Sequence, residues 1–300
     1  MSDKQLNSDN IVLLKIHRNS SYELSQTIQN FNKMIIKEIE PTTKNINENI
    51  FDGDLSIIIN ELINLIFKGL NEGKDEEILK HHVLNYINNY KIISQEIYNW
   101  LSNNQNNSNS IYLLGYFIYY GIGTDSNKQK AFELYHKAAA LENSVAQLVL
   151  IDAYILGKGV YKNYNLAFEL SKKLADEECV CGINSLGYCY EEGIGTDIND
   201  QKAFELYQKA ANLGDSNGIY NLAYCYYYGI GTDVNNQKAF QLHQKAANLG
   251  LHYAQYNLAL KYENGDGVKK DIDKAIYWYK KSAEQENKVA QHKLKVLLKE

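Results

Sequence analysis

The sequence predicts an all-α protein, a right-handed α/α superhelical solenoid of five 36-residue helix-loop-helix repeats with a C-terminal capping helix. Three observations predict this fold: a Gly-x-Gly segment that recurs every 36 residues, an Ala column with the same period, and helical apolar spacing on both sides of the glycines. The single Pro of the 300 residues also favours helices over the Pro-rich turns of most β-sandwiches.

Two columns define the period independently of each other. The first loop glycines are Gly121, Gly157, Gly193, Gly229 and Gly265, and the alanines are Ala131, Ala167, Ala203, Ala239 and Ala275. Each step in both columns is 36 residues. Five copies in register indicate a repeat array.

The first element of each repeat is a predicted helix, here named helix A, that ends at the loop glycine. Counted back from that glycine, position −7 is always Leu, position −3 is aromatic in four repeats, and position −11 is always small. These positions share one helix face, and the small residue permits close approach of the next helix.

The second element, named helix B, follows the loop. Its apolar residues, such as Ala203, Phe204, Leu206, Ala210 and Ala211, have helical spacing. One A–B pair is too small to bury its own apolar face, so we expect stability to come from stacking of successive pairs.

The run AQYNLALKYENGDGVKKDIDKAIYWYKKSA at residues 254–283 carries a resemblance to a known family. It resembles the Sel-one-like repeat, a relative of the tetratricopeptide repeat, and the resemblance covers about residues 110–289. It implies that the A helices line a concave groove. It also implies roles common in the family, which are signalling and protein quality control. Repeat two departs most, because Leu174 replaces the usual Ala and its loop lacks Thr-Asp.

The segments outside the repeats complete the predicted organisation. Residues 1–50 are expected to be a partly flexible segment with one helix, and residues 51–109 a helical N-terminal cap over the open face of repeat one. Within the cap, Asp54 and Asp75 are candidate helix N-caps. Residues 110–289 hold the five repeats. Residues 290–300 form the capping helix, whose polar outer face leads us to expect the array to end there.

Composition excludes several classes of function. A pI near 5.9, with Arg18 as the only Arg among 31 basic residues, argues against nucleic acid as a partner. The N-terminus lacks the apolar stretch of an export signal, and no apolar run reaches the roughly 20 residues of a membrane span. We therefore expect a cytoplasmic protein with reduced cysteines and no membrane contact.

The loop glycines and the cysteines are better explained by structural roles than by phosphate or metal binding. The glycine loops lack the Gly-Lys-Ser/Thr of a phosphate loop, and helix C-capping explains five equivalent copies better. Cys189 and Cys225 share one column and are predicted to pack in semi-buried positions, and Cys179-Val-Cys181 lacks the spacing of a zinc site. We expect no catalytic residue, no cofactor and no metal.

The informative surface is the other face of helix A, at positions −9, −5 and −2, where Tyr is favoured. Tyr provides large contact area with few rotatable bonds and a polar end, which is typical of binding hot spots. The alternative explanation is an AT-biased coding sequence that enriches Tyr. The predicted partner-binding residues are Tyr112, Tyr116, Tyr119, Asp152, Tyr188, Glu191, Tyr220, Tyr224, Tyr227, Tyr256 and Glu263.

These observations predict a non-catalytic, monomeric scaffold or adaptor that binds a peptide or helix of a partner protein in the groove. A sharper hypothesis, suggested by the family resemblance, is a role in signalling with a protein kinase. The alternative from another class is a hydrolase-like enzyme of the penicillin-binding type seen among bacterial relatives, but no Ser has a Lys three residues after it. A self-assembling structural solenoid is the third hypothesis, and the Lys-rich final helix weakens it.

Overall fold

The structure is a computed structural model that describes residues 52–298, except residues 73, 75 and 286. Residues 51–300 form one compact unit, separate from residues 1–50. The helix and flexible segment predicted within residues 1–50 lie outside the described residues. The described part contains helices and no strand.

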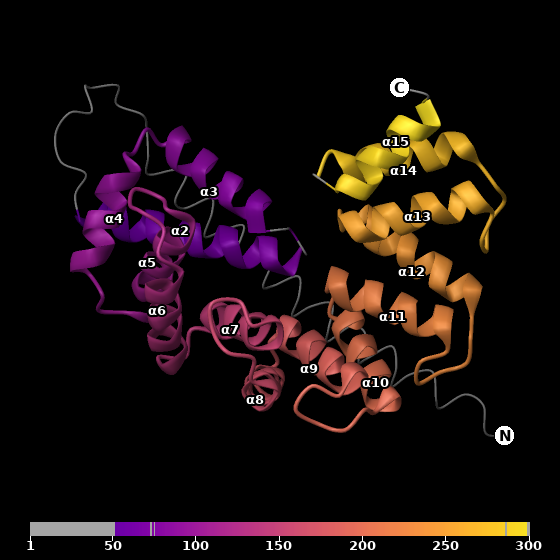
Figure 1. The fold of residues 1–300 in the computed structure, drawn as a ribbon, viewed down its shortest axis with the longest axis horizontal. Coiled ribbons are helices and arrows are strands. Elements are labelled where there is room, and N and C mark those ends of the chain that lie inside the picture. The colour runs from indigo at the N-terminus through magenta and orange to yellow at the C-terminus, as the bar shows by residue number, and fades with distance from the viewer. Residues whose placement is uncertain (1–51, 73, 75, 286, 299–300) are drawn as a thin grey trace, which may run out of the picture. The chain divides into compact units, whose positions relative to one another are not determined.

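The helices follow the predicted order (Figure 1). The N-terminal helices are α2 (Asp52–Asn71), α3 (Glu76–Asn89) and α4 (Ser94–Asn103). The A helices are α5 (Ser108–Tyr120), α7 (Ser144–Leu156), α9 (Val180–Glu192), α11 (Ser216–Tyr228) and α13 (His252–Asn264). The B helices are α6 (Lys128–Ala140), α8 (Tyr164–Asp176), α10 (Asp200–Asn212), α12 (Asn236–Asn248) and α14 (Ile272–Ala283), and α15 (Lys288–Leu298) follows them. Successive helices pack against one another from α5 to α15, which confirms the all-helical solenoid.

Helix ends are set by two polar columns. The first loop glycines cap the A helices in the left-handed region, with φ between 66° and 86°, as the sequence predicts. A column that we did not predict starts the B helices: Asn127, Asn163, Asn199, Asn235 and Asp271 each accept a hydrogen bond from the backbone N–H three residues later, at 2.9–3.1 Å. Each such cap is worth about 1 kcal/mol.

The second loop glycine makes the close contact between successive repeats. A Cβ atom on Gly231 would lie 2.2 Å from the carbonyl oxygen of Asp200, the first residue of α10. A Cβ atom on Gly123 would lie 2.5 Å from the carbonyl oxygen of Ser94, the first residue of α4. The contact of α4 with the loop of repeat one is therefore the same as the contact of the B helix α10 with the loop of the next repeat. The sequence of α4, however, shows no copy of the repeat pattern.

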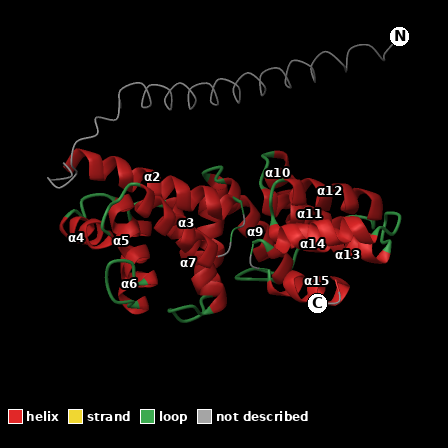
Figure 2. Cartoon of the chain, turned by 90° about the horizontal axis from the view of Figure 1, so that it is seen from above, coloured by secondary structure: helices red, strands yellow, loops and turns green. Residues whose placement is uncertain are grey.

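Aromatic contacts join the repeats at a second point. The pairs Phe168–Tyr190, Phe204–Tyr226 and Phe240–Tyr262 meet edge to face, with ring centroids 5.5–5.8 Å apart. The alanine column and both Cys189 and Cys225 are fully buried, so the predicted packing role of these cysteines is confirmed and their burial is deeper than predicted. The stacked helices are seen from above in Figure 2.

Two local predictions need comment. Asp54 lies inside the first turn of α2 and is not its N-cap, because the helix begins at Asp52; Asp75 lies outside the described residues. In repeat two, Leu174 is fully buried and faces Gly182, as Ala210 faces Gly218 in the next junction; an added Cβ would lie 2.3 Å and 2.6 Å from the facing Cβ atoms. Among the described helices, none is long and apolar enough to cross a membrane.

Candidate functional site

The predicted binding residues lie on one surface of the A helices, here named the helix A face and defined by positions −9, −5 and −2 of each repeat. Their exposure differs along the chain. Tyr188 and Tyr224 are 40% and 39% exposed, and Asp152 is also exposed. The half-buried members are Tyr119, Glu191, Tyr220, Tyr227, Tyr256 and Glu263.

Tyr112 and Tyr116 correct the expectation of a groove along all five repeats, because they are only 1% and 3% exposed. Helices α2 and α3 cover this part of the helix A face, where Ile66 and Leu79 lie beside the two tyrosines. The cover also makes a polar contact with the array, in which Glu76 of α3 pairs with Lys158 at 3.0 Å. Repeat one therefore does not present these tyrosines to a partner.

A central pocket of about 530 Å³ opens on the helix A face of repeats two to five. Its walls come from α7, α9, α11 and the start of α13, so four successive repeats share one cavity. It brings together three predicted residues, Asp152, Tyr188 and Tyr220. A pocket of this breadth can hold an extended segment or one face of a helix.

Side-chain amides link neighbouring A helices along this pocket. Asn221 donates a hydrogen bond from Nδ2 to Oδ1 of Asn184 at 3.0 Å, and Asn257 donates one from Nδ2 to the Tyr220 hydroxyl at 2.9 Å. We did not predict these two hydrogen bonds. The sequence feature that could have indicated them is the Asn that repeats four and five share at position −8.

The carboxyl of Asp152, in the central pocket, has a raised pKa. Desolvation by the surrounding protein raises the pKa of its carboxyl to about 6, and the Lys158 ammonium acts in the opposite direction. Asp152 as a whole residue is exposed, and it lines the central pocket. It is the one candidate acid of the helix A face in repeat two.

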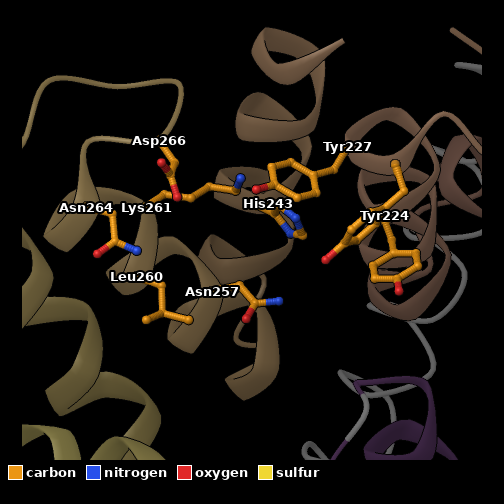
Figure 3. A pocket seen from close by; sticks show the side chains of 9 residues that line it. Tyr224, Tyr227, His243, Asn257, Leu260, Lys261, Asn264 and Asp266 are labelled. Carbon is orange, nitrogen blue, oxygen red and sulfur yellow. The ribbon is translucent and has the colours of Figure 1, made fainter. Parts of the chain in front are cut away.

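A second cavity of about 170 Å³, here named the C-terminal pocket, lies between α11, α12 and α13 (Figure 3). Lys261 is only 7% exposed, and its amine lies 4.1 Å from the centroid of the Tyr227 ring. His243 is 3% exposed, and burial, with a smaller effect of Lys261, lowers its pKa to about 3. The imidazole is therefore neutral at physiological pH. Tyr224, Tyr228, Asn257, Leu260, Asn264 and Asp266 complete the lining.

We did not predict Lys261 and His243, although both break a column of the repeat. The residues equivalent to Lys261 are Phe117, Ala153, Cys189 and Cys225, and those equivalent to His243 are Tyr135, Ser171, Tyr207 and Tyr279. The sequence feature that could have indicated this pocket is Lys261, a charged residue in an otherwise apolar column.

Three cysteines of the described residues are in environments that disfavour the thiolate. Burial raises the pKa of the thiols of Cys181, Cys189 and Cys225, to about 12 for Cys225, so these cysteines are protonated at neutral pH. Residues 52–298, where the structure describes them, contain no group of three His, Cys, Asp or Glu side chains arranged to hold a metal ion.

Comparison with known proteins gives a consistent result. The family model described as Sel1 repeat matches residues 108–143, 152–179, 182–215, 216–251 and 252–287, more than half of the chain. The chain is similar to the crystal structure of a Sel1 repeat protein from Oxalobacter formigenes, with 31% identity and a TM-score of 0.58, over 69% of this chain and 83% of that one.

It is also similar to a protective antigen of uropathogenic Escherichia coli strains that displays an SLR fold. The identity is 28% and the TM-score 0.54, over 82% of this chain and 49% of that one, so this chain spans about half the length of that protein. A search of curated proteins found no match.

Proposed function

The chain belongs to the Sel1 repeat family, whose members are generally protein-interaction scaffolds, and we propose that it binds a segment of a partner protein on the helix A face. The observation that carries this proposal is the central pocket, because it extends over four successive repeats and is lined by Tyr188 and Tyr220. Exposed aromatic side chains beside fixed amides suit a peptide, which offers both apolar side chains and backbone hydrogen-bonding groups.

The molecule's own N-terminal helices support a helical occupant. On repeat one, α2 and α3 cover Tyr112 and Tyr116, which are equivalent in position to Tyr220 and Tyr224 of repeat four. The helix A face of repeat one is thus a surface that packs against helices. We infer that the uncovered face of repeats three to five accepts a helix or an extended segment of another protein.

Finer parts of the proposal rest on the family resemblance and on composition. We propose a non-catalytic adaptor that is monomeric and cytoplasmic, with a protein kinase in a signalling pathway as the first partner class to test. The formal net charge of −5 and the near absence of Arg support a protein partner over nucleic acid.

The test is affinity capture with the intact chain and with the double variant Tyr188→Ala and Tyr220→Ala. Because a tyrosine buried by a partner contributes about 2 kcal/mol, we expect the double variant to lose more than tenfold in affinity for any partner that uses the pocket. Circular dichroism should show the same helix content in both proteins.

A matched control removes two tyrosines elsewhere. Tyr161 and Tyr277 are 97% and 53% exposed and line no described pocket on the helix A face. The variant Tyr161→Ala and Tyr277→Ala should keep the partner. Equal capture by both double variants would refute the proposed surface.

A further inference from the structure

Repeats three and five share a part-buried polar pair between their own helices. The tyrosines of these pairs are buried and the glutamates are half-buried: in repeat three, the hydroxyl of Tyr207 in helix B donates to the carboxylate of Glu191 at position −2 of helix A. In repeat five, Tyr279 donates to Glu263 at the equivalent positions. The same geometry therefore places a carboxylate on the helix A face twice, two repeats apart.

Repeat four lacks this pair. Tyr227 stands where the neighbouring repeats have Glu, and His243 stands where they have Tyr. The Nδ1 atom of His243 is buried and has no hydrogen-bond partner among the described residues. The site therefore lacks a carboxylate at position −2 and leaves a polar atom unsatisfied, and its one lining carboxylate is that of the exposed Asp266.

The next A helix nevertheless supplies a cation to this site. Lys261 forms no ion pair with a carboxylate within the described residues, and its amine lies over the face of the Tyr227 ring. In repeat five, the next helix also supplies a cation, from a different register: Lys293 of α15, which is equivalent to Asn257 and not to Lys261, pairs with Glu263 at 3.1 Å. Repeat five thus holds a Lys–Glu–Tyr cluster, whereas in repeat four Lys261 lies beside a position −2 that has Tyr227 in place of Glu.

We propose that the C-terminal pocket binds the side-chain carboxylate of an acidic residue in the partner segment, at the position that Glu191 and Glu263 occupy in the neighbouring repeats. This inference rests on the proposed function, since it names the chemistry of one contact on the helix A face. The Lys261 ammonium supplies the charge, and Tyr224, Asn257 and Asn264 offer hydroxyl and amide donors around the cavity (Figure 3).

The physical reason is the cost of a buried charge without a counter-charge. Burial lowers the pKa of Lys261, and the exposed carboxylate of Asp266 on the following loop acts in the opposite direction without forming an ion pair. A partner carboxylate in the cavity would offset the desolvation of the ammonium. A neutral side chain of the same shape would not.

Short synthetic peptides provide the test. The first has one central Glu and is acetylated and amidated at its ends; the second replaces that Glu by Gln; the third is the Gln peptide with a free carboxyl terminus. The protein is labelled with ¹³C and ¹⁵N at lysine, and the Lys261 side-chain signal is assigned by its loss in Lys261→Met. We expect saturable shifts and a raised Lys261 pKa with the Glu peptide alone.

Three variants sharpen the result. Lys261→Met should weaken binding of the Glu peptide by about tenfold, because a charge-assisted interaction is lost. The matched control is Lys238→Met, because Lys238 also lies over a tyrosine ring, at 4.8 Å from Tyr226, but is exposed; binding should be unchanged. Tyr227→Glu restores the carboxylate present in repeats three and five, so it should pair with Lys261 and abolish the response to the peptide.

Every other pattern overturns the proposal. Equal response to the Glu and Gln peptides, response to the free carboxyl terminus alone, no response at all, or full binding by Lys261→Met would each exclude a side-chain carboxylate site. These outcomes are separable from failure of the proposed function. Partner capture that depends on Tyr188 and Tyr220 reports on the central pocket and does not require Lys261.

Discussion

Repeats one and four carry the same tyrosines in the same register but expose them differently. Positions −9, −5, −2 and −1 are all Tyr in both repeats. At position −5, Tyr116 is 3% exposed in repeat one, whereas Tyr224 is 39% exposed in repeat four. The difference arises from α2 and α3, which cover repeat one and have no counterpart over Tyr224 in the described part of the chain.

This comparison shows that a repeat column specifies the chemistry of a surface, while the neighbouring elements decide whether that surface is free. Tyr112 and Tyr116 of repeat one are buried, whereas Tyr224 of repeat four stays partly exposed. Four predictions test this difference, from the largest expected effect to the smallest.

The largest effect is expected from matched truncations at position −5. Tyr116→Ala should lower the free energy of unfolding by about 3 kcal/mol, because it leaves a cavity beneath α2 and α3. Tyr224→Ala should cost less than about 1 kcal/mol, because its side chain is already partly hydrated. Urea unfolding followed by circular dichroism measures both values.

A conservative variant separates packing from hydrogen bonding at the same position. The Tyr116 hydroxyl is buried and has no hydrogen-bond partner among the described residues. Tyr116→Phe should therefore leave stability unchanged or raise it. Similar losses for Tyr116→Ala and Tyr224→Ala would show that the N-terminal helices do not cover repeat one in solution.

The second prediction tests whether α4 acts as a B helix toward repeat one. Gly123→Ala and Gly231→Ala should each cost about 2 kcal/mol, because both have positive φ and their new Cβ atoms would collide with a backbone carbonyl. Gly267→Ala should cost about half as much, since its Cβ would meet the nearest carbonyl at 3.4 Å. Thermal unfolding of the three variants compares them, and a tolerated Gly123→Ala would remove the analogy.

The period, the helix pairs and the glycine caps were predictable because each repeat must bury the same face against the next one. A buried stack tolerates little variation, so its columns are legible in one sequence. The role of α4 was not predictable in this way. Its contact uses the backbone carbonyl of Ser94, which any residue could supply.

The sequence predicted which residues share the helix A face, but it did not predict which of them are exposed. Register places Tyr188, Tyr220 and Tyr224 on it, but exposure depends on elements far away in the sequence, and Tyr112 and Tyr116 were covered for that reason. Asp152 was predicted as a surface residue, whereas its raised pKa follows from the protein that surrounds it. Such an environment exists only after the repeats have stacked.

The third prediction concerns the helix caps of the two repeats. Asn107 begins the A helix of repeat one, and Asp215 begins that of repeat four, where its carboxylate accepts from the Gly218 N–H at 2.6 Å. Burial raises the pKa of Asp215 to about 6, above its ordinary value near 3.8, although two backbone hydrogen bonds act in the opposite direction. The folded state therefore holds this proton more tightly, so the contribution of Asp215 to stability falls as pH rises from about 4 to 6.

Asp215→Asn gives repeat four the same kind of cap as repeat one. It keeps the acceptor and removes the buried charge, so it should raise the free energy of unfolding by about 1 kcal/mol above pH 6 and change little below about pH 4. Urea unfolding across this pH range is the measurement. A loss of stability at pH 7 would mean that the carboxylate, in its ionised form, is the better cap.

The smallest effect is expected from the ion pair between the N-terminal cover and the array. Lys158 and Glu76 are 3.0 Å apart, but their side chains are 48% and 53% exposed, so water and salt screen the pair. Lys158→Ala should change the free energy of unfolding by less than about 0.5 kcal/mol, with or without added salt. The apolar contacts of Ile66 and Leu79 with the tyrosines should hold the cover in place. A loss above about 1 kcal/mol that disappears in high salt would show instead that the Lys158–Glu76 ion pair holds α3 on repeat one. Breaking that ion pair would then expose the tyrosines of repeat one as a second candidate binding surface.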